Sequence, residues 1–141
     1  MLSLQRINCL NVKNTKIEWK VTTLLYMYSL MHMSIGVNNF NGTIPPKMRF
    51  LFKLRYMEIN NNRFSGTIPM TIGRLSKLII INLSNNHITS NISSLLENMS
   101  KLVTIYLHTN QLTGEISGSL GELLNIFGFY YPSNILTGTL P

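Results

Sequence analysis

One asparagine recurs at a constant interval along most of this chain and marks a longer repeated pattern. It stands at Asn38, Asn62, Asn86, Asn110 and Asn134. Apolar or aromatic residues keep the same offsets around each copy, and in the second copy they are Leu54, Met57, Ile59, Phe64 and Ile68. Five in-register copies without an insertion predict a solenoid, in which each repeat is one coil that packs on its neighbours.

The positions within each repeat predict its local structure. Apolar residues alternate just before the asparagine, which predicts a short strand with one buried face, and stacked copies would form a parallel sheet. The asparagine amide can donate to and accept from backbone groups at the turn that follows. A glycine four residues later, absent only at Ser90, indicates a permissive backbone angle. The return half keeps its own apolar columns, which predict irregular or 3₁₀ turns on the convex side; they are Met48, Ile72, Leu96 and Leu120, and Leu51, Leu75, Met99 and Leu123.

The full pattern, L-x-x-L-x-L-x-x-N-x-L-x-G-x-I-P, resembles the plant-specific class of leucine-rich repeats. A following L-G-x-L-x-x-L, here IGRLSKL at 72–78 and LGELLNI at 120–126, strengthens the resemblance. Within that class the chain is similar to the ectodomains of receptor-like kinases and receptor-like proteins, and to polygalacturonase-inhibiting proteins. The resemblance implies an α/β solenoid: a right-handed superhelix with a parallel β-sheet on its concave face and irregular or 3₁₀ turns on its convex face.

The repeats divide the chain into two parts. Residues 30–141 form the array, in repeats 30–53, 54–77, 78–101, 102–125 and an incomplete 126–141. Residues 1–29 are interpreted as a degenerate repeat or a remnant N-terminal cap, and the frame projected backwards puts Cys9 and Asn14 on the second-Leu and Asn positions. The family's paired cysteines and C-terminal cap are lacking, so we expect a truncated fragment of a longer protein.

Strand residues that point away from the core are the candidate ligand contacts. Read off the repeat frame, the candidates on the concave face are His32, Ser34, Tyr56, Glu58, Asn60, Asn82, Ser84, Thr104, Tyr106, His108 and Tyr130. Aromatic residues dominate interface hot spots, so Tyr56, Tyr106, Tyr130 and His108 are the expected anchors.

Composition and motifs argue against catalysis, metal binding and nucleic-acid binding. The chain contains no Asp, which excludes a Ser-His-Asp triad, and its lone Cys9 has no His nearby in the sequence. His32 and His108 lie three repeats apart, roughly 15 Å, too far to share a metal ion. No catalytic residue, metal site or cofactor is expected.

The net charge of +7 comes largely from residues between Lys47 and Lys77. Lys53, Lys77 and Lys101 recur at the repeat spacing, just before the first Leu of each repeat. We interpret them as the solvated edge of the array, which would serve solubility or attraction to acidic surfaces such as pectin. No recognition motif for nucleic acid accompanies them, so no nucleic-acid partner is expected.

Four N-x-S/T motifs are candidate N-glycosylation sites, at Asn41, Asn82, Asn91 and Asn98. Chance alone predicts about three in a chain with this content of Asn, Ser and Thr, so their number does not indicate secretion. A glycan on Asn82 would block the concave face.

Three functions are compatible with these patterns. The first is a non-enzymatic recognition module of a receptor ectodomain, with a protein or peptide ligand and a co-receptor as its partners. The second is an extracellular inhibitor of the polygalacturonase-inhibiting type, and the third is a decayed fragment without activity. The resemblance implies the extracellular face of the plasma membrane or the cell wall, with a membrane reached only through a parent receptor, although the chain shows neither a signal peptide nor a membrane span.

Overall fold

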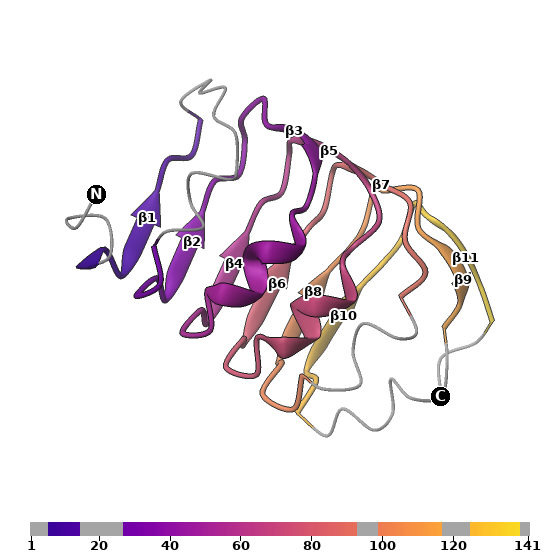
Figure 1. Ribbon diagram of the computed structural model, residues 1–141. Helices are drawn as coiled ribbons and strands as arrows, with labels where there is room; N and C mark the ends of the chain where they lie inside the picture. Colours follow the sequence, from indigo (N-terminus) through magenta and orange to yellow (C-terminus); the bar gives the residue numbers. More distant parts are fainter. Residues whose placement is uncertain (1–5, 15–26, 93–98, 117–124, 139–141) are drawn as a thin grey trace.

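The computed structural model describes residues 6–14, 27–92, 99–116 and 125–138, and it is a solenoid of stacked coils (Figure 1). Its main sheet has six parallel strands in sequence order, β1–β2–β4–β6–β8–β10. These strands are β1 (Cys9–Asn11), β2 (His32–Ser34), β4 (Tyr56–Glu58), β6 (Ile80–Asn82), β8 (Thr104–Tyr106) and β10 (Gly128–Tyr130). The structure confirms the leucine-rich-repeat solenoid and its parallel sheet.

From β2 to β10 each strand residue pairs with its equivalent in the next repeat. Met33 lies opposite Met57, Met57 opposite Ile81, and Ile81 opposite Ile105. These central residues are buried, while the residues on either side of them point to the other face of the sheet. The repeat period of the sequence is therefore the coil period of the fold.

The first strand departs from the projected frame by one position. Leu10, not Cys9, lies opposite Met33, so β1 stands one position later in the sequence than the repeat frame requires. In this register Ile7, Leu10 and Val12 take the apolar positions and pack against the core, while Cys9 is exposed. The projection failed because it assumed the full repeat length for a coil that is shorter than the others.

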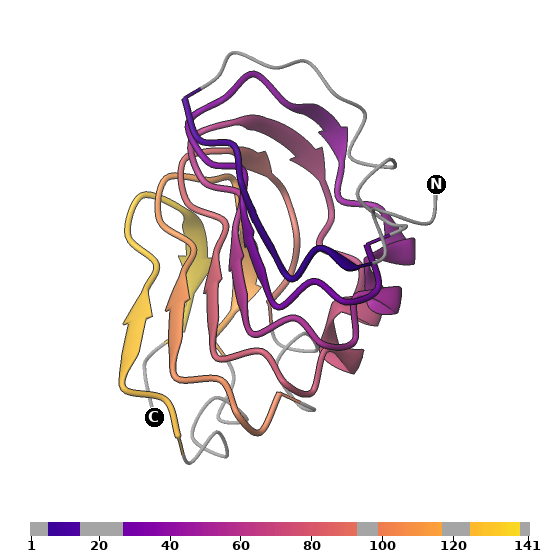
Figure 2. The ribbon, with the colours of Figure 1, turned by 90° about the vertical axis from the view of Figure 1, so that its left-hand side faces the viewer.

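Short strands after the asparagine turn form two further sheets that the sequence did not predict. One is β3 (Asn41–Thr43), β5 (Arg63–Gly66) and β7 (His87–Ile88), and the other is β9 (Thr113–Glu115) with β11 (Ile135–Thr137). Figure 2 shows the coils nearly end-on. The column glycines lie in these strands or at their ends with φ between 71° and 91°, the left-handed conformation expected of them.

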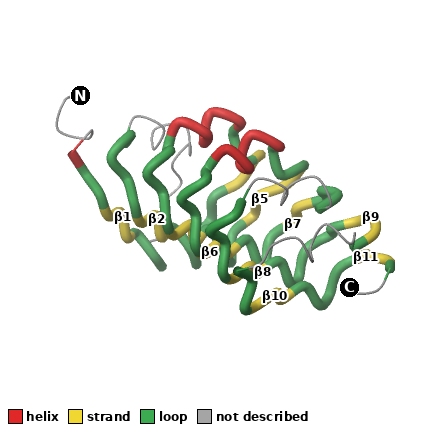
Figure 3. Tube along the Cα trace, turned by 90° about the horizontal axis from the view of Figure 1, so that it is seen from below, coloured by secondary structure: helices red, strands yellow, loops and turns green. Residues whose placement is uncertain are grey.

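The return half of the coil is helical at two described places. Two 3₁₀ helices, η3 (Pro46–Phe50) and η4 (Met70–Arg74), each follow an extended proline. Figure 3 shows them stacked on one side of the coils, away from the main sheet. They confirm the 3₁₀ turns, and they bury Met48 and Ile72.

One continuous apolar core fills the stack from Met27 to Ile116. Its members include Leu51, Leu75 and Met99 of the second convex column, whereas Leu96, Leu120 and Leu123 lie outside the described residues. Toward the two ends the packing loosens, and Ile7, Phe129 and Leu136 are only partly buried.

The repeated asparagines link each coil to the one before it. Asn86 Nδ2 donates to the carbonyl oxygens of Ile59 in the preceding coil, at 3.1 Å, and of Leu83 and Ser84 in its own. Its Oδ1 accepts a hydrogen bond from Phe64 N–H at 3.0 Å. Asn62 and Asn110 repeat the pattern on neighbouring coils. One side chain thus satisfies backbone groups of two coils where the chain turns.

The residue before each of these asparagines is left-handed. Its φ lies between 53° and 58° at Val37, Asn61, Asn85, Thr109 and Ser133, and Asn14 takes the equivalent position in the first coil with φ 54°. Asparagine tolerates this conformation, whereas a β-branched residue such as Val37 or Thr109 is strained in it. The backbone bond from Val37 N–H to Asn60 O, at 2.9 Å, holds the turn in place.

We predict that Asn86→Leu lowers the free energy of unfolding by about 3 kcal/mol, because it leaves buried backbone groups of two coils without a partner. Thermal and urea unfolding measure the loss. Asn134→Leu is the matched control, since Asn134 makes the same bonds in a half-buried coil where water can replace them, and it should cost about 1 kcal/mol. Equal effects at the two positions would contradict the role of burial.

We predict that Val37→Asn stabilises the fold by about 1 kcal/mol and raises the melting temperature by roughly 4 °C. The side chain of Val37 is 46% exposed, so little packing is lost on substitution. The reverse change at the equivalent position, Asn61→Val, should lower the melting temperature by a similar amount. A melting temperature unmoved by both changes would show that the turn carries no such strain.

Candidate functional site: the open face of the main sheet

The face of the main sheet that points away from the core carries most of the predicted contact residues. We call it the open face, and it corresponds to the predicted concave face. From β2 to β10 each strand contributes its first and third residues, which stack in two rows. The first row is His32, Tyr56, Ile80, Thr104 and Gly128, and the second is Ser34, Glu58, Asn82, Tyr106 and Tyr130.

Aromatic rings gather at the C-terminal end of the open face. The rings of Tyr106 and Tyr130 stack with centroids 4.7 Å apart and planes 9° from parallel. The ring of His108 meets Tyr106 edge-on, with centroids 6.4 Å apart. A Cβ atom at Gly128 would lie 2.9 Å from the Tyr130 ring, so the glycine leaves room for that ring over β10. We call Tyr106, His108 and Tyr130 the aromatic cluster.

The N-terminal end of the open face combines one ring pair with an ionic group. His32 and Tyr56 stack with centroids 4.5 Å apart. Beside them, Lys13 Nζ lies 2.6 Å from Glu58 Oε2, and Ser34 Oγ donates to the same oxygen at 2.7 Å. Three coils therefore meet at one carboxylate.

The environment of Glu58 sets its protonation state. Burial raises the pKa of the carboxyl, but the hydrogen bonds from Lys13 and Ser34 and the charges of Lys13 and His32 lower it by more. The resulting pKa lies below the ordinary value of 4.5, so Glu58 is an anion at neutral pH.

Several predicted contact residues have partners within the face. Ser34 and Ser84 are buried, which the sequence did not indicate. Ser84 donates from both its Oγ and its backbone N–H to Asn82 Oδ1, at 2.7 Å and 3.1 Å. Asn60 lies over Gly36, where a Cβ atom would stand 2.7 Å from its Oδ1. These polar groups shape the face. Tyr56, Thr104, Tyr106 and His108 on the same face are half-buried, and Tyr130 is exposed.

The candidate glycosylation sites fall on different surfaces. Asn41 is exposed in β3, and Asn91 is exposed beside β9, against Gly114. Asn82 is half-buried on the open face, and Asn98 lies outside the described residues. Asn41 and Asn91 are therefore the described motifs that lie away from the open face.

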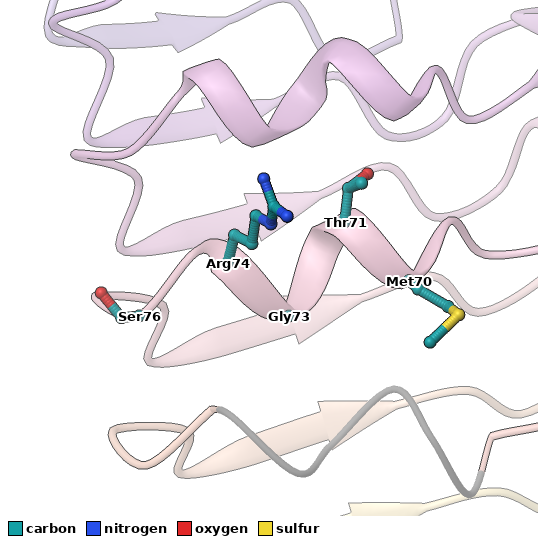
Figure 4. A pocket seen from close by; sticks show the side chains of 5 residues that line it. All are labelled: Met70, Thr71, Gly73, Arg74 and Ser76. Carbon is teal, nitrogen blue, oxygen red and sulfur yellow. The ribbon is translucent and has the colours of Figure 1, made fainter.

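A hollow of about 550 Å³ lies beside η4 on the convex side, where the sequence indicated no site. It is lined by Met70, Thr71, Gly73, Arg74 and Ser76 (Figure 4). Thr71 Oγ1 already donates to Pro46 O at 2.9 Å, which ties η4 to η3. Arg74 is the one ionisable side chain among these five lining residues, and a single arginine offers no acid–base pair for catalysis.

Within the described ranges, no three His, Cys, Asp or Glu side chains gather as a metal site would require. No helix found there has the length and apolarity needed to cross a membrane.

We predict that Glu58→Gln destabilises the fold at neutral pH and not in acid. A carboxyl whose pKa is lowered by folding stabilises the native state above its unfolded pKa, and that contribution is lost as the pH falls through the folded value. The melting temperatures of the wild type and the variant should therefore differ at pH 7 and converge below pH 4.5. A difference that persists unchanged at pH 3 would contradict the ionic role of Glu58.

Comparisons with known proteins agree with this architecture. The family model described as leucine rich repeat matches residues 52–112. No curated protein matches the chain.

Among solved structures, the chain is similar to the PEPR1–AtPEP1 structure, at 32% identity and a TM-score of 0.80, covering 84% of this chain and 17% of the other. It is also similar to the Arabidopsis receptor kinase HAESA, solved with the peptide hormone IDA and the co-receptor SERK1, at 28% identity and a TM-score of 0.78, covering 84% and 20%. An internalin from Listeria monocytogenes matches at 28% identity and a TM-score of 0.69, covering 86% and 34%.

These similar structures agree on the fold of the chain. The chain spans about a fifth of the two receptor chains, and the bacterial match shows that the fold alone does not identify a receptor. The repeat match, the stacked parallel strands and the solved relatives agree on one architecture: the chain has the leucine-rich-repeat solenoid fold and resembles the ectodomains of plant receptor kinases.

Proposed function

We propose that this chain is a non-enzymatic recognition module that binds a protein or peptide ligand on its open face, as part of a receptor-like ectodomain. The similarity to HAESA supports the class of ligand, since that receptor was solved with a peptide and a co-receptor. Such a module works at the extracellular face of the plasma membrane or in the cell wall, and it reaches a membrane through its parent receptor.

The aromatic cluster is the observation that carries this proposal. Tyr106 and Tyr130 combine a large apolar ring with a hydroxyl group, the combination enriched at interface hot spots. Tyr130 is 49% exposed, so half of its surface is free to contact a partner. Stacking holds the two rings in place before any partner arrives, which lowers the entropy lost on binding.

The backbone beneath the cluster is held by strand pairing, on both sides at β8 and on one side at β10 among the described strands. β8 pairs with β6 and with β10, and Leu107 N–H donates to Tyr130 O at 2.7 Å. The side chains therefore stand at the coil spacing of about 5 Å, as a fixed row that an extended peptide can follow.

One of the described candidate glycosylation sites, Asn82, lies on the open face. A glycan on Asn82 would stand between Glu58 and Tyr106 in the second row and would exclude a ligand. Glycans on Asn41 or Asn91 would lie on the other sheets and leave the open face accessible. The proposed function thus requires Asn82 to be unmodified.

Selection from a phage-displayed random peptide library tests the proposal. Peptides enriched on the wild-type chain should lose at least about thirtyfold in affinity for the Tyr106→Ala/Tyr130→Ala variant, since both anchors are removed. Fluorescence anisotropy with the labelled peptides measures the change. The double variant should keep its melting temperature to within a few degrees, because neither tyrosine belongs to the buried core.

Tyr28→Ala is the matched control, since Tyr28 is an exposed tyrosine that lies outside the open face. It should change the affinity less than twofold. Enriched peptides that bind the double variant as tightly as the wild type would exclude the open face as the binding site, and a double variant that unfolds would show that the tyrosines are structural.

A further inference from the structure

A basic groove runs along the edge of the stack where the strands of the main sheet begin. It has a volume of about 260 Å³, and four of its six lining residues are cationic. The residues come from neighbouring coils and are Met31, Lys53, Arg55, Lys77, Ile79 and Lys101. The turns that lead into β4, β6 and β8 lie side by side along this edge (Figure 1). The lysines that recur at the repeat spacing thus line one side of this groove.

The three lysines occupy equivalent positions in three equivalent turns. Leu54 N–H donates to Leu51 O, Leu78 N–H to Leu75 O, and Leu102 N–H to Met99 O, each at 2.9 Å. Lys53, Lys77 and Lys101 each come just before the residue that closes its turn. Adjacent coils stand about 5 Å apart, so the backbone positions of the three lysines form a row about 10 Å long.

The backbone beside the lysines is held by shared acceptors. Met31 O accepts from the N–H groups of both Arg55 and Tyr56, at 2.8 Å and 3.1 Å. Arg55 O accepts in the same way from Ile79 and Ile80, at 2.8 Å and 3.2 Å. Met31, Arg55 and Ile79 are therefore stacked at a fixed spacing, with one cation between two apolar side chains.

These four cations have no counter-charge in the described part of the chain. The ion pair found there joins Lys13 to Glu58 on the open face, and none of the groove cations lies within ion-pair distance of a described carboxylate. Four cations within a few coils repel one another, which costs free energy in the unbound protein. An anionic partner that neutralises them would relieve this repulsion.

We propose that the basic groove binds an acidic peptide segment in an extended conformation. In an extended peptide the side chains alternate, so carboxylates on one side can pair with the lysine row. Apolar residues of the same segment can rest on Met31 and Ile79, which are 40% exposed and half-buried respectively. A groove about 10 Å long accommodates about three extended residues of such a segment.

The lining of the groove favours a peptide over other polyanions. The six lining residues include no aromatic side chain on which a nucleic-acid base could stack. Binding of a long polyanion grows with the number of charges it neutralises, and this groove offers four. A uronate chain has no apolar group to match Met31 and Ile79. This site shares no residue with the open face, and it does not rest on the function proposed for that face.

Fluorescence anisotropy with synthetic peptides on the full chain tests this proposal. The probe is a labelled Glu-Leu-Glu-Leu-Glu peptide, and Gln-Leu-Gln-Leu-Gln is the uncharged comparison. The acidic peptide should bind the wild type, and the Lys53→Gln/Lys77→Gln/Lys101→Gln variant should bind it about tenfold more weakly. The Ile79→Ser variant should bind the acidic peptide about threefold more weakly, because the apolar contact is reduced. Raising the salt concentration should also weaken the binding of the acidic peptide.

A matched variant separates this groove from the general positive charge. Lys47→Gln/Arg49→Gln/Arg74→Gln removes the same number of charges from η3 and η4, and it should change the affinity less than twofold. Equal losses in the two triple variants would overturn the proposal, since net charge alone would then explain binding. Tighter binding of an oligogalacturonate or a single-stranded oligonucleotide than of the peptide would also overturn it. All the substituted lysines are exposed, so circular dichroism should show an unchanged fold.

Discussion

The hydrogen bonds of the repeated asparagine hold this structure together. Each amide joins the carbonyl of the preceding coil, the carbonyls of its own turn and an N–H group of the preceding coil. Where the chain turns away from the strand, these backbone groups have no strand partners, and burying each of them without a bond would cost about 1–3 kcal/mol. Because the same side chain bonds these groups once in every repeat, the coils stack in one register, and the open face and the basic groove both take their spacing from it.

That spacing has different consequences on the two surfaces. On the open face it brings rings from successive repeats into stacking contact, as in Tyr106 with Tyr130 and His32 with Tyr56. At the edge where the strands begin, it sets like charges side by side, and the lysines repel where the rings attract. In a stack of equivalent coils, a residue type that recurs at one repeat position thus forms a continuous row of like side chains. The fold itself is shared with proteins as different as HAESA and a Listeria internalin, so the fold alone does not specify a ligand.

Much of the fold could be predicted from the sequence, because its determinants repeat. The strands, the buried columns and the 3₁₀ turns follow from apolar spacing, and the glycines at positive φ follow from their own column. The first coil was misplaced, since its shorter length shifts every side chain in it while Asn14 still imitates the ladder position. The second row of short sheets was missed because a brief Gly-containing segment has no apolar alternation. The left-handed column was hidden as well, since Val37, Asn61 and Thr109 share a backbone angle and no side-chain chemistry.

The sequence by itself determined the period, the core and the columns, because these depend on residues that recur at a constant separation. Only the tertiary structure decided which members of a column are accessible. Ser34 and Ser84 belong to the predicted face yet are buried by their partners, while Glu58 is held as an anion by Lys13 from the irregular first coil. The tertiary structure also places Arg55, Met31 and Ile79 beside the lysine column in one groove. These outcomes depend on contacts between coils, and such contacts arise only when the chain has closed each turn on the one before.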